Sequence, residues 1–225
     1  MRLNKSFLSI SLLAVCGLTE PAAFADIQYV VTVDTSSQSG NGGYIDLQFD
    51  PSSFTTQPAN ADVTNFSTDG TLDIFGDNPF DGMSGDVSGT LPGTVSFDNG
   101  TSTNEYTQGM TFGTTISFNV DLSGPAIDLP NGEGGGSFFL TFYDPSGNAL
   151  LTNNPNGPAF EVDINGDGST TATAFANASG GPTVVTSAGP TEVTPTPEPS
   201  MVLLLAGGLA AMAAFRRRTP VLRCG

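Results

Sequence analysis

One stretch of the sequence has the residue types and spacing of a metal-binding loop. It runs from Asp163 to Ser169 and reads Asp-Ile-Asn-Gly-Asp-Gly-Ser. Oxygen atoms at alternate positions, with a glycine for a tight turn, suit Ca²⁺, which takes about six to eight oxygen ligands. The twelfth position is Ala174, where an EF-hand has a bidentate Glu. Asp163, Asn165 and Asp167 are therefore candidate calcium ligands, and a polar hairpin turn is the alternative for the same residues.

Carboxylates on the expected polar strand faces suggest a second kind of chemistry. A glycosidase uses two carboxyl groups, one as the acid and one as the nucleophile or base. However, 21 acidic residues lie between Asp26 and Phe215, so pairs also arise by chance, and the chain has no Trp and only four Tyr for an aromatic sugar platform. We therefore expect no enzymatic activity. An exported glycan hydrolase is kept as the third alternative, with these candidate carboxylates: Asp46, Asp121, Glu161 and Asp163.

The inventory of reactive residues excludes several other activities. The chain has no His, and Cys16 and Cys224 both lie in terminal targeting segments. Nucleophiles of the Ser-His-Asp and Cys-His kinds are excluded, as are the usual nitrogen and sulfur ligands of zinc. No Lys or Arg occurs from Asp26 to Phe215, and the formal charge of this part is close to −21. A nucleic-acid partner is excluded because phosphate binding needs a basic footprint. No cofactor other than calcium is indicated.

Alternating apolar and polar residues predict β-strands through the middle of the chain. The period of two is clearest at residues 27–33, 45–49, 116–122, 138–142 and 160–164. Turn sequences such as Asp69-Gly70 and Asn131-Gly132 lie between such stretches, and no sustained helical period occurs. Half-buried strands with regular turns favour an all-β fold over residues 26–186. We expect an antiparallel two-sheet sandwich of the jelly-roll or Ig-like kind, with a core made mostly of Phe.

The first 25 residues have the three parts of a secretory signal peptide. Two basic residues near the start precede an apolar run at residues 7–18, which is shorter than the roughly 20 residues of a membrane span. Ala23 and Ala25 are the small residues at positions −3 and −1 before Asp26. We expect signal peptidase to cleave after Ala25, so that the exported chain begins at Asp26.

The C-terminal segment has a second targeting pattern. A Pro/Thr-rich linker at residues 187–199 should be extended. It leads to an apolar run at residues 201–215, whose helix would rise about 22 Å, somewhat short of a hydrocarbon core of about 30 Å. A basic cluster and a short tail at residues 219–225 follow; the cluster consists of Arg216, Arg217 and Arg218. By the positive-inside rule these arginines stay cytoplasmic, and the β-domain lies outside the inner membrane.

This order of parts resembles the PEP-CTERM sorting domain over residues 197–218, with Pro197, Glu198, Pro199 and Ser200 as its motif. The resemblance implies recognition by exosortase, an integral-membrane processing enzyme, in an outer-membrane bacterium that makes exopolysaccharide. This arrangement is similar to other C-terminal sorting signals, in which a hydrophobic tail is removed during processing. The body is also similar to a family of small secreted PEP-CTERM proteins without an assigned activity. That similarity is carried by residues 43–49, 85–93, 112–118 and 151–155.

These signals predict a destination and, more coarsely, a role. We expect an inner-membrane intermediate with a cytoplasmic C-terminus, followed by display at the cell surface or in the extracellular matrix. The leading hypothesis is a non-enzymatic structural or adhesive protein associated with exopolysaccharide. The alternative is a calcium-dependent carbohydrate-binding or adhesion module centred on Asp163, Asn165 and Asp167. The expected partners are signal peptidase, an exosortase-type enzyme, the inner membrane and extracellular polysaccharide.

Overall fold

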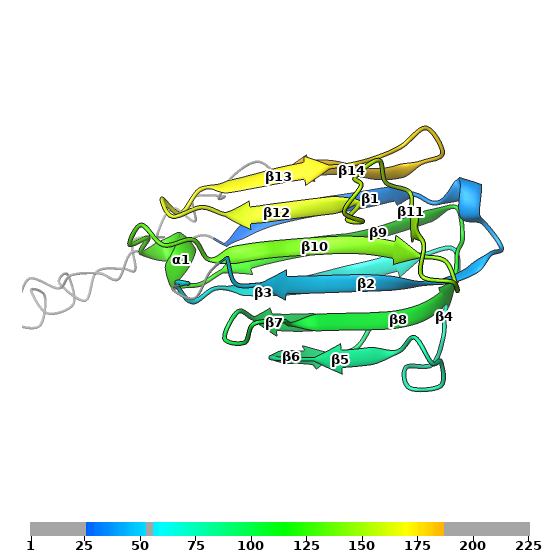
Figure 1. The fold of residues 1–225 in the computed structure, drawn as a ribbon, viewed down its shortest axis with the longest axis horizontal. Coiled ribbons are helices and arrows are strands. Elements are labelled where there is room, and N and C mark those ends of the chain that lie inside the picture. The colour runs from blue at the N-terminus through cyan, green and yellow to red at the C-terminus, as the bar shows by residue number, and fades with distance from the viewer. Residues whose placement is uncertain (1–25, 53–55, 187–225) are drawn as a thin grey trace, which may run out of the picture.

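The computed structural model describes residues 26–52 and 56–186 of the 225-residue chain. Within these ranges two antiparallel sheets pack face to face, as the sequence predicts (Figure 1). Sheet A holds, in spatial order, β14 (Gly181–Thr186), β1 (Ile27–Asp34), β9 (Thr115–Ser123), β3 (Asn60–Thr68), β7 (Val95–Asp98) and β6 (Val87–Gly89). Sheet B holds β13 (Thr170–Ala174), β12 (Phe160–Ile164), β10 (Gly136–Tyr143), β2 (Gly42–Asp50), β8 (Glu105–Thr111) and β4 (Thr71–Leu72).

Short elements complete the two sheets. In sheet B, β11 (Ala149–Leu150) pairs with β10, and β5 (Gly82–Ser84) pairs with β8. A 3-10 turn (Ser36–Gln38) follows β1, and the short helix α1 (Pro125–Asp128) follows β9. All five predicted strands are present, as β1, β2, β9, β10 and β12, with ends that agree within three residues.

The core lies between the sheets and consists largely of aromatic rings. Phe138 of β10 packs edge-on against Phe97 of β7, with 6.2 Å between ring centroids, and Tyr29 of β1 packs in the same way against Phe160 of β12, at 6.4 Å. Both contacts join sheet A to sheet B. Phe dominates the core as expected; the buried Phe residues are Phe49, Phe66, Phe97, Phe112, Phe118, Phe138, Phe142 and Phe160.

Several predicted segments lie outside the described residues. These are the signal peptide at residues 1–25, the linker at residues 187–199 and the membrane helix at residues 201–215. Among the residues that the structure does describe, no helix has the length and apolar character needed to cross a membrane.

Candidate functional site

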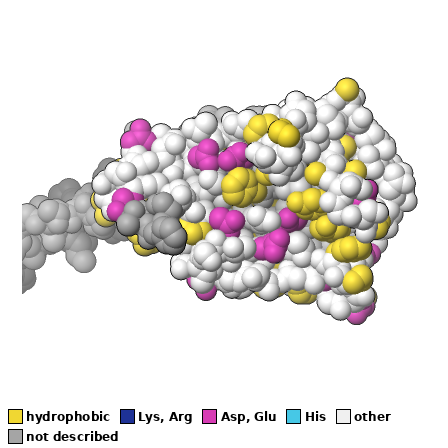
Figure 2. Space-filling view, viewed as in Figure 1, with side chains coloured by type: hydrophobic (Ala, Val, Ile, Leu, Met, Phe, Trp, Pro, Cys, Tyr) yellow, Lys and Arg dark blue, Asp and Glu magenta, His cyan; other side chains and the backbone are white. Residues whose placement is uncertain are grey.

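The outward faces of the two sheets differ in composition. On sheet A, β9 turns Ser117, Asn119 and Asp121 outward, whereas its apolar residues are buried. Sheet B instead turns aromatic side chains outward, among them Phe139 of β10, which is half-buried. Figure 2, viewed from the side of sheet B, shows hydrophobic and acidic side chains interspersed on this surface. We refer to the outward side of sheet B as the aromatic face and define it by Tyr44, Phe80, Phe139 and Tyr143.

Three of these rings form a stack across the sheet. The ring of Tyr44 lies between Phe80, with 4.7 Å between centroids, and Tyr143, with 5.0 Å between centroids. The interplanar angles are 12° and 23°, so the rings are close to parallel. Strand register brings the two tyrosines together, because Tyr44 of β2 lies directly opposite Tyr143 of β10.

A glycine on β8 makes room for the third ring. Gly109 lies opposite Tyr44 on the other side of β2, and a Cβ atom there would collide with the side chain of Asn78. The loop between β4 and β5 can therefore lie directly on the sheet. The Asp81 carboxylate holds this loop by accepting the backbone N–H groups of Gly76 and Gly109, both at 2.7 Å. As a result Phe80 is held against Tyr44.

A buried carboxyl group lies beside the ring stack. Asp46 points to the outward side of β2 yet is only 3% exposed, between Thr141 of β10 and Thr107 of β8. The Nε2 atom of Gln48 donates to Asp46 Oδ2 at 3.0 Å and to Glu105 Oε1 at 3.1 Å. One amide therefore bridges two carboxyl groups.

Burial changes the acidity of this group. The pKa of Asp46 is raised to about 7, mainly by desolvation and then by the nearby negative charges of Glu105 and Asp50, against the hydrogen bond from Gln48. No Lys, Arg or His occurs in residues 26–186 to offset this effect. Asp46 can therefore take up or release a proton near neutral pH.

A second carboxyl pair lies on β12. Ser137 Oγ donates to Asp163 Oδ1 at 2.5 Å, and Glu161 hydrogen-bonds to Asp163. Burial raises the pKa of Glu161, and the Asp163 carboxylate adds to this shift. Strand register places Glu161 opposite Phe139, so this pair belongs to the outward side of sheet B.

The four carboxylates proposed from sequence do not converge. Asp46, Glu161 and Asp163 share the outward side of sheet B, but Asp121 lies on the outward side of sheet A. There its carboxylate accepts hydrogen bonds from Gln28 Nε2 at 2.5 Å and Thr64 Oγ1 at 2.8 Å. Asp121 therefore takes no part in a site on sheet B, because the whole core separates the two surfaces.

The predicted calcium ligands lie at the hairpin between β12 and β13, where each has a partner within the protein. Asp167 Oδ1 accepts from the backbone N–H of Ser169 at 3.0 Å and from its hydroxyl at 2.5 Å. Asn165 Nδ2 donates to Ser169 Oγ at 3.1 Å, and Asp163 pairs with Ser137. Across residues 26–52 and 56–186, no three side chains of the Asp, Glu, His or Cys types form a group suited to a metal. Calcium binding by Asp163, Asn165 and Asp167 stays a prediction.

A thermal melt tests the calcium alternative directly. Because Asp163, Asn165 and Asp167 already have partners, we expect the melting temperature to agree within about 1 °C in millimolar CaCl₂ and in EDTA. A calcium-dependent rise of several degrees that disappears in Asp167→Ala would instead establish the site. Asp144→Ala is the matched control, because Asp144 is a hairpin aspartate that accepts hydrogen bonds from Ser146 and Asn148 in a similar way.

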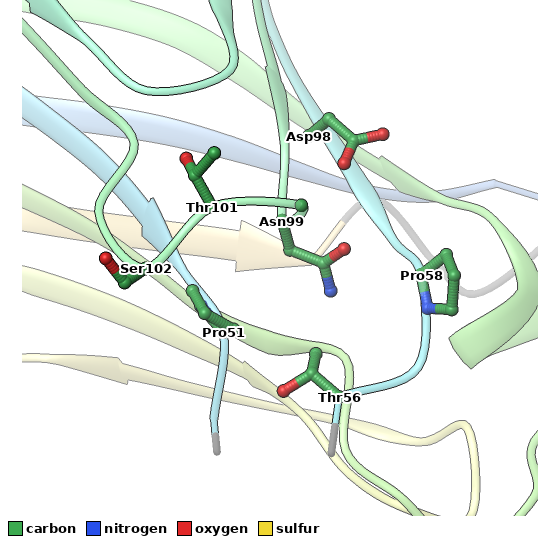
Figure 3. Close-up of a pocket in the computed structure, with 8 residues that line it drawn as sticks. Pro51, Thr56, Pro58, Asp98, Asn99, Thr101 and Ser102 are labelled. Atoms are coloured by element: carbon green, nitrogen blue, oxygen red, sulfur yellow. The ribbon is translucent and has the colours of Figure 1, made fainter. Parts of the chain in front are cut away.

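A pocket of about 520 Å³ lies at one end of the sandwich, between Pro51 and Pro58 on one side and the turn after β7 on the other (Figure 3). The buried Asn99 lines it, and its amide serves the fold. Asn99 Oδ1 accepts the N–H of Ala59 at 3.1 Å, and Nδ2 donates to the carbonyl oxygens of Gln57 at 2.8 Å and Gly135 at 2.5 Å. The pocket thus lies where loops meet, and the Asn99 amide that lines it already has hydrogen-bond partners within the protein.

Comparison with known proteins adds one finding, which concerns the C-terminal segment. Residues 195–218 match the PEP-CTERM protein-sorting motif, which confirms the resemblance seen in the sequence. No curated protein and no solved structure gives a significant match to the chain. The sorting motif lies outside the described residues, so its match bears on export and processing and not on the aromatic face.

Proposed function

Because the chain carries the PEP-CTERM protein-sorting motif of exported substrates of exosortase-type enzymes, we propose that it is a non-enzymatic protein of the cell envelope or extracellular matrix. Its role is structural or adhesive and associated with exopolysaccharide. Signal peptidase removes residues 1–25, the segment at residues 201–215 holds the protein in the inner membrane, and processing then delivers the β-sandwich to the surface of an outer-membrane bacterium.

The sorting motif is the observation that carries this proposal, and the chemistry of the domain supports it. The domain has no His or Cys, so it has no nucleophile of the Ser-His or Cys-His kinds. The carboxyl groups of Asp46 and Glu105 lie within 3.1 Å of one amide nitrogen, an arrangement that favours the hydrolase alternative. Yet Asp46 is 3% exposed. A glycosidic bond could not reach it, which favours a role without turnover.

Processing in the native host tests the proposal. We expect the wild-type product to begin at Asp26, to end near Pro199 and to fractionate with the cell surface or the matrix. Replacement of Pro197, Glu198 and Pro199 by Ala removes the motif, so this variant should keep residues 201–218 and stay in the inner membrane. Intact mass and cell fractionation report both results.

Matched controls make the outcome specific. Substitution of Gly189, Pro190 and Thr191 by Ala changes the linker ahead of the matched residues and should leave processing intact. In a host strain without exopolysaccharide, we expect the processed wild type to be released into the medium. A wild-type protein that keeps its tail in the inner membrane would contradict display at the surface, and hydrolysis of any polysaccharide in a panel would contradict the non-enzymatic role.

A further inference from the structure

We propose that the aromatic face of sheet B binds a segment of uncharged polysaccharide, which contacts the stacked rings of Tyr143, Tyr44 and Phe80 and the hydrogen-bond acceptors beside them. The inference rests on the proposed function, to which it adds a binding site and a class of ligand. It is carried by four observations, namely where the outward aromatic residues lie, how they are held, which hydrogen-bond acceptors share their face, and which charges surround them.

The aromatic residues are concentrated on one of two otherwise comparable surfaces. An antiparallel sheet with one solvated side normally turns polar residues outward. Sheet A follows this rule, with Asn60, Asp62 and Thr64 on β3. Sheet B departs from it at Tyr44 and at two positions of β10. Aromatic side chains are enriched where proteins recognise ligands, because a ring offers a large contact area with few rotatable bonds.

The ring stack is positioned before any ligand arrives. Tyr44 is fixed on both sides by rings at 4.7 Å and 5.0 Å, and the glycine at position 109 allows the Phe80 loop to rest on the sheet. A ligand that docks on a rigid row of rings loses less free energy to ordering than one that must assemble the row. The C–H groups of a sugar ring pack against the negative faces of aromatic rings.

Polar groups lie further along the same face, where Gln48 of β2 lies opposite Phe139 of β10. Gln48 is half-buried, and its Nε2 atom is held between Asp46 and Glu105. Its carbonyl oxygen has no hydrogen-bond donor among the described residues, so a sugar hydroxyl can donate to it. The Glu105 carboxylate, also half-buried, is a second acceptor for sugar hydroxyls. A polysaccharide supplies many hydroxyl donors for such acceptors.

Charge selects among polysaccharides. The chain has no Lys, Arg or His between Asp26 and Phe215, and the aromatic face carries Glu105, Glu161 and Asp163. Uronate or sulfate groups would lie close to these carboxylates without any cation between them, and the repulsion acts over roughly 8 Å at physiological salt. An uncharged chain avoids this repulsion and still provides hydroxyl groups for the acceptors.

The test measures retardation of the processed protein, purified from its host, in native gels that contain dextran, galactomannan or mixed-linkage β-glucan, with alginate as the acidic comparison. We expect retardation by at least one neutral polysaccharide and none by alginate. Tyr44→Ala and Phe80→Ala should each weaken that binding at least about fivefold. Leu129→Ala is the control, because Leu129 is 65% exposed and lies after α1 at the end of the sandwich, so binding should be unchanged.

Phe80 lies in a loop, so Phe80→Ala should fold even if Tyr44→Ala does not, and the test then rests on Phe80→Ala. Circular dichroism and the melting temperature show whether each of the two variants is folded. Unchanged binding by a folded Phe80→Ala variant would overturn the site. Binding to a charged polymer, either alginate or polylysine, without binding to any of the neutral polysaccharides would overturn it as well. If the protein still co-fractionates with the host exopolysaccharide in that case, only this inference fails. If the wild type binds no neutral polymer and does not co-fractionate, the proposed function fails with it.

Discussion

The variant Asp46→Asn is expected to be more stable than the wild type by about 2–4 kcal/mol at pH 8 and nearly equal to it at pH 4. The pKa of Asp46 is about 7 in the folded protein, against an ordinary value of 3.8. Between these values the folded chain holds a proton that the unfolded chain has released. The contribution of Asp46 to the free energy of unfolding is therefore fully present below pH 3.8 and is lost as the pH rises through about 7.

The size of the effect follows from the same numbers. The difference between about 7 and 3.8 corresponds to roughly 4 kcal/mol, the cost of ionising a desolvated carboxyl group near other negative charges. Asn at position 46 removes this cost and keeps an oxygen for the Gln48 amide. Glu105→Gln removes only the neighbouring charge, so its gain at pH 8 should be smaller.

Urea unfolding at pH 4, 6 and 8 measures these differences. Asp69→Asn is the matched control, because it removes the same charge where the effect has the opposite sign. Hydrogen bonds from the Thr114 side chain and the Thr115 backbone lower the pKa of Asp69, so this variant should lose stability at pH 8. An Asp46→Asn gain that is equal at pH 4 and at pH 8 would contradict the role of burial.

The strands that the sequence predicted are those with an uninterrupted period of two, and the missed ones break that period for visible reasons. On β8 the inward positions are Tyr106, Gln108 and Met110. A Gln at a core position hides the alternation. The structure tolerates it because Gln108 Oε1 accepts from the Tyr106 hydroxyl at 2.6 Å and Nε2 donates to the Asp73 carbonyl at 2.7 Å. On β3 the register shifts between Thr64 and Ser67, which displaces the pattern within the strand.

The candidate site depends on these missed features. Outward placement of Asp46, Glu161 and Asp163 follows from alternation alone, but Glu105 lies on β8 and could not be placed beside them. The absence of Trp and the scarcity of Tyr predict no aromatic platform. In the structure, strand register nevertheless joins Tyr44 to Tyr143, and a loop adds Phe80. Which residues lie opposite one another on neighbouring strands depends on the register of the strands, and the sequence pattern within a single strand does not predict that register.

Phe138→Ala should lower the free energy of unfolding by about 3–5 kcal/mol, the largest loss that we expect from any single truncation. Phe138 is fully buried, and its ring contacts Phe97 of sheet A and Phe160 of its own sheet, at 6.2 Å and 6.5 Å between centroids. Its removal opens a cavity where the two sheets meet. The part of the chain between the targeting segments has no Cys, so no disulfide limits the damage.

The next residue along the chain provides the control. Phe139 has the same side chain on the same strand, but it is half-buried on the aromatic face. Phe139→Ala should therefore cost less than about 1 kcal/mol in stability, while it weakens the polysaccharide binding that we propose. Urea unfolding of both variants at pH 5 compares them directly. Equal losses of stability would mean that Phe138 and Phe139 do not point to opposite sides of β10. The outward direction of Tyr143 depends on the same alternation, so the ring stack would then be rejected as well.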